Sequence, residues 1–278
     1  MDQVHSDWGD WLPRAVADAD PDGLRVWYLG CNGFVLKAGD GTTLLIDPYL
    51  GTGDPPRTVR MVPVPFAPED VEETDAVLAT HEHTDHVHGP SQAPILAGTD
   101  ATFHAPDAGL AVVEEEGWRE AFDLGDDRFA EVAEGDAFDV GGVTVRVEPA
   151  HDPDADHPVS YVIEYEGRRF FHGGDARPSE AFADVGDRYD LHLGALAFGS
   201  VGMLLDRETR EPTRTRWYSD ENDVVEAANQ LGLDRLLPTH WDMWKGMTAD
   251  PTALHEHARS FDRPRSLEIR EIGDAANV

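Results

Sequence analysis

Three histidines and one aspartate that can bind metal ions stand together in residues 80–86, Thr-His-Glu-His-Thr-Asp-His. The preceding residues, 75–79, are mostly apolar and predict a buried strand that delivers this segment to the edge of a sheet. His81 and His83 are two positions apart, so in an extended chain they share a face and can bind one ion. Asp85 and His86 follow where we expect the chain to turn into a helix, and their different direction suits a second ion. Imidazole and carboxylate groups suit zinc, manganese and iron.

Further residues that can bind metals come directly after other predicted strands. A strand over 143–149 is followed by His151, with His157 as a rival six residues later. A strand over 169–172 leads into Gly-Gly and then Asp175, where glycine lets the backbone approach closely and one carboxylate projects. A short strand over 236–239 leads to His240. Taken singly, each would read as an ordinary loop or turn residue, but together they predict a site built from several strand ends.

Residues 80–86 resemble the H-x-H-x-D-H signature of the metallo-β-lactamase superfamily. The resemblance implies an α/β (α+β) fold, a four-layer αββα sandwich of two mixed sheets, with the metal site at one edge of the paired sheets. It also implies ligands for two divalent ions, zinc or manganese: His81, His83 and His151 for the first, Asp85, His86 and His240 for the second, and Asp175 bridging both. Three neighbours would support the ligands: Asp47, His172 and Asp242. For Asp47, a cap at the end of a strand is an equally good interpretation.

A second resemblance narrows the family. His240-Trp-Asp-Met-Trp, followed at a short distance by Ala-Asp-Pro at 249–251, is similar to the C-terminal metal loop of the UlaG-like L-ascorbate-6-phosphate lactonases. Residues 75–81 and the Gly-Thr-Gly segment at 51–53 are similar to theirs as well. The loop over 50–68 looks shorter here than in those lactonases, and some of them lack a histidine at the position of His151.

The resemblance implies a metal-dependent hydrolase. Two ions would lower the pKa of a water held between them to about 7, so that hydroxide is available at neutral pH. Asp85 would act as the catalytic residue, orienting the nucleophile and then protonating the leaving alkoxide. We expect the substrate to be a phosphorylated sugar lactone. The alternatives are a phosphodiesterase or ribonuclease with the same metals and, from another class, a metal-binding module without turnover.

The remaining elements must position these residues, and we expect one domain over 1–278. Strands are predicted over 24–28, 34–38 and 42–46, with a hairpin turn at Asp40-Gly41 between the last two. Helices are predicted over 106–117, 220–231 and 251–260, and a final strand over 267–272. Residues 1–22 form a polar lead-in, either an edge helix or an interface arm. A βα alternation followed by hairpins is typical of an α/β sandwich with mixed sheets.

Two stretches without periodicity, 50–68 and 199–219, are predicted to be variable active-site loops. Basic side chains are scarce in this chain, so those in or near these loops are candidates for binding an anionic substrate, because a guanidinium matches phosphate or carboxylate with two parallel hydrogen bonds. The candidates are Arg57, Arg60, Arg214, Arg216 and Lys245, and the second loop also contains Arg207 and Arg210. The ordinary alternative is surface pairing in a very acidic protein.

The chain of 278 residues has 55 acidic against 22 basic side chains and a net charge of -33, and only two of the basic residues are lysines. Such a surface is typical of a protein kept soluble in concentrated salt, so we expect a salt-adapted, halophilic source. The charge disfavours nucleic acid and anionic membranes as partners. The single cysteine, Cys31, excludes an internal disulfide and is interpreted as a small buried residue. The sequence predicts no signal peptide and no membrane span, hence a cytoplasmic protein. Trp8 and Trp11 would suit a homo-oligomer.

Overall fold

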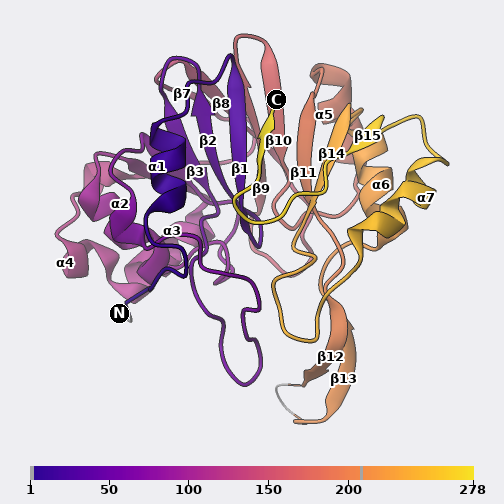
Figure 1. Cartoon of the computed structure of the whole chain (residues 1–278), viewed down its shortest axis with the longest axis horizontal. Helices are drawn as coiled ribbons and strands as arrows, with labels where there is room; N and C mark the ends of the chain where they lie inside the picture. The colour runs from indigo at the N-terminus through magenta and orange to yellow at the C-terminus, as the bar shows by residue number, and fades with distance from the viewer. Residues whose placement is uncertain (1–2, 207–208) are drawn as a thin grey trace.

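Two seven-stranded mixed sheets face each other in the computed structural model, which describes residues 3–206 and 209–278 (Figure 1). Arg207 lies outside the described residues. Apolar side chains from both sheets fill the space between them, among them Phe34, Val145 and Phe170. Helices cover the outer face of each sheet. The expected αββα sandwich is therefore confirmed, and strands β1 to β6 form the N-terminal sheet together with β16 from the C-terminal end.

The N-terminal sheet has the strand order β16-β1-β2-β3-β4-β5-β6. Its pairs are antiparallel from β16 to β3 and parallel from β3 to β6. Thr42 donates its backbone N–H to the Asp40 carboxylate in the predicted β2–β3 turn. The strands are β1 (Leu24–Gly30), β2 (Gly33–Ala38), β3 (Thr43–Ile46), β4 (Ala76–Leu78), β5 (Thr102–Ala105), β6 (Phe129–Glu131) and β16 (Ala275–Asn277).

The C-terminal sheet has the strand order β15-β14-β11-β10-β9-β8-β7. It is parallel from β15 to β10 and antiparallel from β10 to β7. The predicted final strand over 267–272 is wrong, because only Leu267 of that range lies in a strand and the chain pairs again at β16 in the other sheet. The strands are β7 (Ala137–Val140), β8 (Val143–Pro149), β9 (Val159–Tyr165), β10 (Arg168–His172), β11 (Leu193–Ala197), β14 (Arg235–Thr239) and β15 (Ser266–Leu267).

Four helices pack on the N-terminal sheet through side chains such as Leu12, Leu96 and Trp118: α1 (Trp11–Ala17), α2 (Gly89–Gly98), α3 (Asp107–Glu116) and α4 (Trp118–Phe122). Three pack on the C-terminal sheet: α5 (Glu180–Arg188), α6 (Glu221–Gln230) and α7 (Leu254–Ala258). Short 3-10 turns lie at Pro68–Asp70, Asp126–Arg128 and Pro251–Ala253. Among the described residues, no helix combines the length and apolar character that a membrane span requires.

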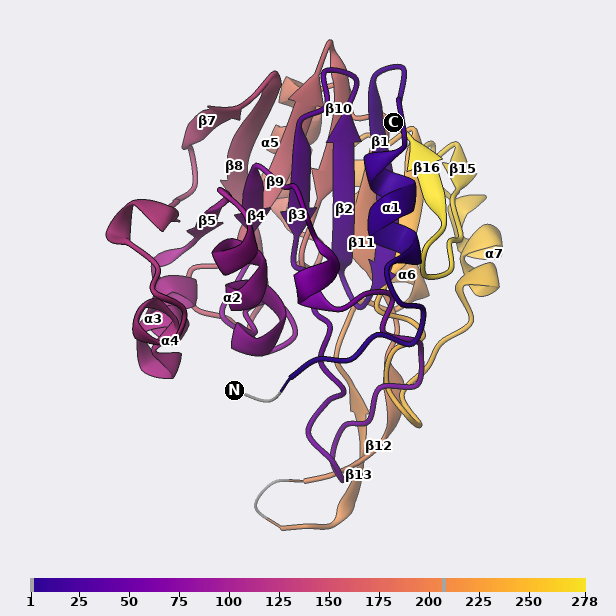
Figure 2. The same ribbon diagram turned by 60° about the vertical axis from the view of Figure 1, so that its left-hand side comes forward.

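The segment 199–219 is not the loop that the sequence predicts. It forms a separate hairpin of β12 (Val201–Leu205) and β13 (Pro212–Arg216), which projects beyond the sheets in Figures 1 and 2. Alternating threonine and arginine in β13 gives an exposed two-stranded ribbon. Its base is tied to the loop after β14, since Gly202 forms a bridge with Met247. The loop over 50–62 also meets the loop after β14, through a bridge between Arg60 and Trp244.

A candidate metal centre at the edge of the sheets

The loop after β4 carries the histidine cluster and is fixed from behind by Asp47 at the end of β3. The Asp47 carboxylate accepts hydrogen bonds from the backbone N–H and the hydroxyl of Thr80, each at 2.8 Å. It also lies 2.8 Å from Nδ1 of His86. Gly174 passes so close that a Cβ there would lie 2.8 Å from the Thr80 hydroxyl. Because β3 and β4 run parallel, they end at the same edge of the sheet, and the Asp47 carboxylate lies directly behind the histidines of the loop after β4.

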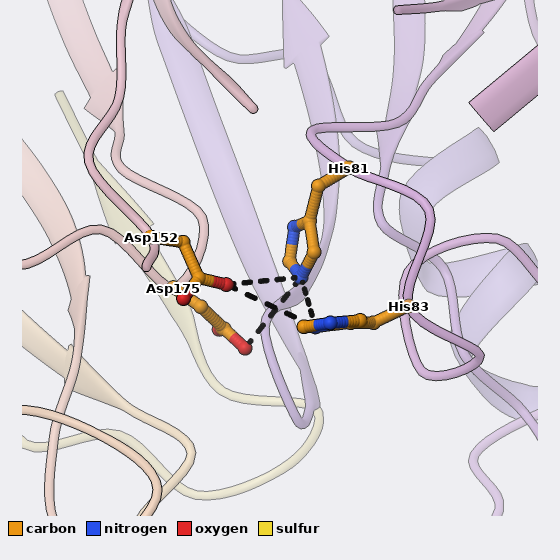
Figure 3. Close-up of side chains that lie close together, drawn as sticks. All are labelled: His81, His83, Asp152 and Asp175. Atoms are coloured by element: carbon orange, nitrogen blue, oxygen red, sulfur yellow. Dashed lines mark hydrogen bonds and ion pairs between the residues drawn. The ribbon is translucent and has the colours of Figure 1, made fainter. Parts of the chain in front are cut away.

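One group of possible ligands, which we call the outer half, consists of His81, His83, Asp152 and Asp175 (Figure 3). Nε2 of His81 lies 2.9 Å from Nδ1 of His83 and 3.8 Å from one carboxylate oxygen of each aspartate. In Figure 3 the two aspartates reach from one side toward the two histidines. The side chain of His83 is 37% exposed, and its Nε2 contacts the carbonyl of Asp154 at 3.0 Å.

A second group, the inner half, consists of His86, Asp175 and His240. Nε2 of His86 lies 3.3 Å from Oδ2 of Asp175, and Nε2 of His240 lies 3.2 Å from Oδ1 of the same carboxylate. Both histidine side chains are completely buried. Asp85 adjoins this group, with Oδ2 at 3.8 Å from Nε2 of His240. Asp175 faces both halves, one oxygen toward His240 and the other toward His81 and His86.

Several buried side chains orient the inner half. Asn32 donates from its side-chain amide to Asp175 at 3.3 Å and accepts from the hydroxyl of Thr239 at 2.8 Å. The ring of Tyr218 stacks on His240, with 4.0 Å between ring centroids. His172, at the end of β10, is buried with Nδ1 at 3.9 Å from Asp47 and Nε2 at 2.8 Å from the Asn32 carbonyl. Such neighbours fix the direction of metal ligands.

The electrostatics of the cluster favour a cation. Burial alone would lower the pKa of His86, but the carboxylates of Asp175 and Asp47 outweigh it and raise this pKa well above its usual value. Burial alone would raise the pKa of Asp175, but His240 and His86 outweigh it and hold this pKa well below its usual value. Burial lowers the pKa of His81, which keeps its imidazole neutral. Burial and the Asp175 carboxylate raise the pKa of Asp152.

The residues present fit divalent ions. Both halves contain imidazole nitrogens and carboxylate oxygens, the donor set that zinc, manganese and iron share. Nε2 of His86 is buried and makes no hydrogen bond, although it lies 3.3 Å from Oδ2 of Asp175. A buried polar atom without a hydrogen bond is costly unless an ion or a water satisfies it. Ions in the two halves would share Asp175.

His151 requires a correction. It is exposed and stands outside both groups, whereas the adjacent Asp152 points into the outer half. Neighbouring residues of an extended chain point in opposite directions, so both cannot face the site. After β8 the His151 carbonyl accepts a hydrogen bond from the N–H of Arg177 at 2.8 Å, in an orientation that directs Asp152 inward. His157, the rival candidate, is also exposed and pairs with Asp107 at 2.9 Å.

Arg60 also requires a correction, because its guanidinium has no donor left for a substrate. It is buried and makes five hydrogen bonds to backbone carbonyls, as many as it has N–H groups: to Leu29, Tyr49, Gly51, Val62 and Pro63. Arg60 therefore holds the 50–62 loop in shape.

The other candidate side chains lie in the surrounding loops and on β13. Arg57 is half-buried in the turn that begins at Asp54. Arg216 pairs with Asp220 at 2.7 Å at the start of α6, and Arg214 is exposed on β13. In the loop after β14, Lys245 is exposed and Asp242 is half-buried and belongs to neither ligand group.

Sequence reasoning missed four residues that the fold brings to the centre: Asp152, Asn32, Cys31 and Arg177. The thiol of Cys31 lies 3.4 Å from both Oδ2 of Asp85 and Nε2 of His240. Arg177 follows Asp175 by two positions and reaches within 4.0 Å of Asp154 at the mouth of the outer half. A usable signal existed for Asp152, an acidic residue directly after a strand end. For Asn32 and Cys31 the only signal was their turn between two strands.

Comparisons with known proteins agree with this architecture. The family model described as "Beta-lactamase superfamily domain" matches residues 42–241. A relative from Salmonella gallinarum, named "Probable L-ascorbate-6-phosphate lactonase UlaG", is 25% identical, with 89% of this chain and 78% of the relative covered. A relative of the same name from Escherichia coli is 24% identical with the same coverage.

Solved structures share the fold. Igni18, described as a novel metallo hydrolase from the archaeon Ignicoccus hospitalis, matches with a TM-score of 0.67 and 19% identity over 91% of this chain and 97% of its own. An isothiocyanate hydrolase from Delia radicum gut bacteria matches with a TM-score of 0.65 and 17% identity over 91% of this chain and 99% of its own.

Proposed function

Because the chain belongs to the β-lactamase superfamily, we propose that it is a two-metal hydrolase that opens a small anionic lactone, as the name of its curated relatives suggests. The observation that carries the proposal is the arrangement of the two halves around Asp175, with Asp85 beside them and 20% exposed. The outer half would hold one divalent ion, zinc or manganese, and the inner half the other. When bound, such ions polarise a carbonyl and lower the pKa of water.

Three aspartates around the centre would have different roles in the reaction. Asp175 would hold the two halves at a fixed separation, and Asp47 would keep His86 turned toward the centre. Asp85, which adjoins the inner half and is more exposed than Asp175, would orient the attacking water and then carry the proton to the leaving alkoxide. The proton thus moves from the nucleophile to the ring oxygen that leaves when the lactone opens.

A small anionic substrate is supported by Arg177. Its side chain is 35% exposed beside Asp154, whose carbonyl contacts His83, so the guanidinium lies next to the outer half. One of its nitrogens donates to the Trp217 carbonyl at 3.1 Å, and its Nε is buried without a hydrogen-bond partner. A substrate carboxylate or phosphate would satisfy this group.

The experiment that tests the proposal is hydrolysis by purified protein in high-salt buffer with zinc or manganese. L-Ascorbate 6-phosphate and an aryl phosphodiester would be offered separately, with His81→Ala as the inactive control. We expect metal-dependent opening of the lactone. Cleavage of the diester alone would show that the protein is a phosphodiesterase rather than a lactonase. If neither substrate is turned over in the presence of metal, the hydrolase assignment is rejected for these substrate classes.

The role of Asp85 has its own test. In Asp85→Asn we expect turnover to fall by about 10²- to 10⁴-fold, the usual contribution of a positioned acid or base. Much of the metal should remain bound, as measured by mass spectrometry, because the other ligands are unchanged. Near-normal turnover in this variant would reject the assigned role.

A further inference from the structure

The only cysteine of the chain lies at the metal centre, although neither the lactonase mechanism nor the ligand set above uses it. Cys31 is completely buried in the turn between β1 and β2. On one side it packs against an apolar cluster: Tyr49, Leu204, Met243, Trp244 and Met247. On the other side its sulfur faces Asp85 and His240. A cysteine that served only to fill space would not need to face two possible ligands.

The spacing of the three donor atoms suits a single ion. The Cys31 sulfur lies 3.4 Å from Oδ2 of Asp85 and 3.4 Å from Nε2 of His240, and these last two atoms are 3.8 Å apart. Zinc binds sulfur at about 2.3 Å and nitrogen or oxygen at about 2.0–2.2 Å, so tetrahedral neighbours lie about 3.3–3.6 Å apart. The triangle needs little adjustment to meet these values.

The backbone holds this triangle in place. The N–H of His240 donates to the Cys31 carbonyl at 2.9 Å, and the hydroxyl of Tyr28 donates to the same carbonyl at 3.0 Å. Cys31 and His240 have φ values of 56° and 63°, a region that residues other than glycine seldom adopt. His240 joins this triangle to the rest of the inner half, where the buried Nε2 of His86 makes no hydrogen bond although it lies 3.3 Å from Oδ2 of Asp175.

We propose that Cys31 is a thiolate ligand of the ion in the inner half, which it would bind together with Asp85 and His240. The inference rests on the two-metal centre of the proposed function and adds a ligand to it. When the ion binds, the S–H bond breaks, the sulfur–metal bond forms and the proton passes to solvent. A soft sulfur donor favours zinc over manganese. The inner half should therefore prefer zinc, whereas the outer half, which has only nitrogen and oxygen donors, should discriminate less.

The test is the absorption spectrum of the full-length protein loaded with Co²⁺, which replaces zinc and gives an intense near-ultraviolet sulfur-to-cobalt band when a thiolate is a ligand. Because the chain has one cysteine, such a band can only come from Cys31. We expect the band in the unsubstituted protein and its complete loss in Cys31→Ser. The weaker visible cobalt bands should remain, since the nitrogen and oxygen ligands are unchanged. The matched control is Asp152→Ala, which changes a ligand of the outer half and should therefore keep the sulfur band.

The outcomes separate this inference from the proposed function. Visible cobalt bands without a sulfur band in the unsubstituted protein would overturn the role of Cys31 and leave the two-metal centre intact. No cobalt binding at all would overturn both. A second measurement does not depend on folding of the variant: zinc should compete with manganese for the inner half at least about tenfold better than for the outer half. Equal competition at the two halves would contradict a thiolate ligand.

Discussion

The outer and inner halves of the metal centre share one carboxylate but differ in the exposure of one histidine. In the outer half His81 and Asp152 are nearly buried, whereas His83 is 37% exposed and contacts a backbone carbonyl. The inner half is buried, and its histidines are oriented by Asp47 and by stacking on Tyr218. Orientation by buried neighbours strengthens metal binding, whereas an exposed ligand keeps rotational freedom. We therefore expect a resident ion in the inner half and a more exchangeable ion, open to substrate, in the outer half.

We expect the largest effect on metal content and turnover from substitution of Asp175, the residue that the two halves share. Asp175→Asn keeps the shape of the side chain but removes its charge, so we expect metal content to fall below one ion per chain. Turnover should fall on the order of 10⁴-fold, as for a member of a catalytic unit. Mass spectrometry for metals and a turnover assay measure these effects, with the exposed Asp190→Asn as control. Two retained ions would show that Asp175 is not shared.

The next effect isolates the outer half. Asp152→Ala removes a carboxylate from the outer half, and we expect binding there to weaken more than about 100-fold, beyond what the loss of a supporting neighbour costs. One tightly bound ion should remain in the inner half. The matched control is His151→Ala, one residue away and exposed, which should retain both ions. Calorimetric titration of metal-free protein distinguishes these results, and the reverse pattern would restore His151 as the ligand.

A smaller effect tests the support of the inner half. Asp47→Asn places an amide opposite Nδ1 of His86 and removes an acceptor from Thr80. We expect the inner ion to bind about 10- to 100-fold more weakly while the outer ion is unchanged. Competition with a coloured chelator gives the two affinities. Equal weakening of both halves would show that Asp47 acts on the fold rather than on His86.

The smallest effect is a difference in pH dependence. The raised pKa of His86 means that its proton stabilises the metal-free protein fully below about pH 6.5, and that this stabilisation is lost as the pH rises through the raised value. An ion must displace this proton and that of the Cys31 thiol, so affinity in the inner half should rise by up to about tenfold per pH unit for each of the two protons across that range. His81, with its lowered pKa, is already neutral there. Affinities measured at several pH values should therefore rise for the inner ion and stay level for the outer one.

The sequence predicted the parts of the centre that follow from strand ends. The fold class is confirmed, and the structure brings together His81, His83, His86, Asp175 and His240, because neighbouring strands deliver their ends to one edge. The choice between His151 and Asp152 was beyond the sequence, because a loop hydrogen bond decides which of two neighbours points inward. The structural role of Arg60 could not be predicted from the sequence either, since its hydrogen-bond partners are carbonyls whose positions depend on the folded loop.

Because Asp175 lies between the two ligand groups, metal binding in one half affects metal binding in the other. One oxygen of its carboxylate lies 3.2 Å from His240 and the other 3.8 Å from His81, so an ion at either end fixes the same side chain for the other. Binding at the two ends is therefore linked, and by reciprocity each ion changes the affinity of the other by the same factor. An ion ordering Asp175 favours cooperative loading, while repulsion between two cations opposes it. Filling of one half would then shift the metal concentration at which the other half fills.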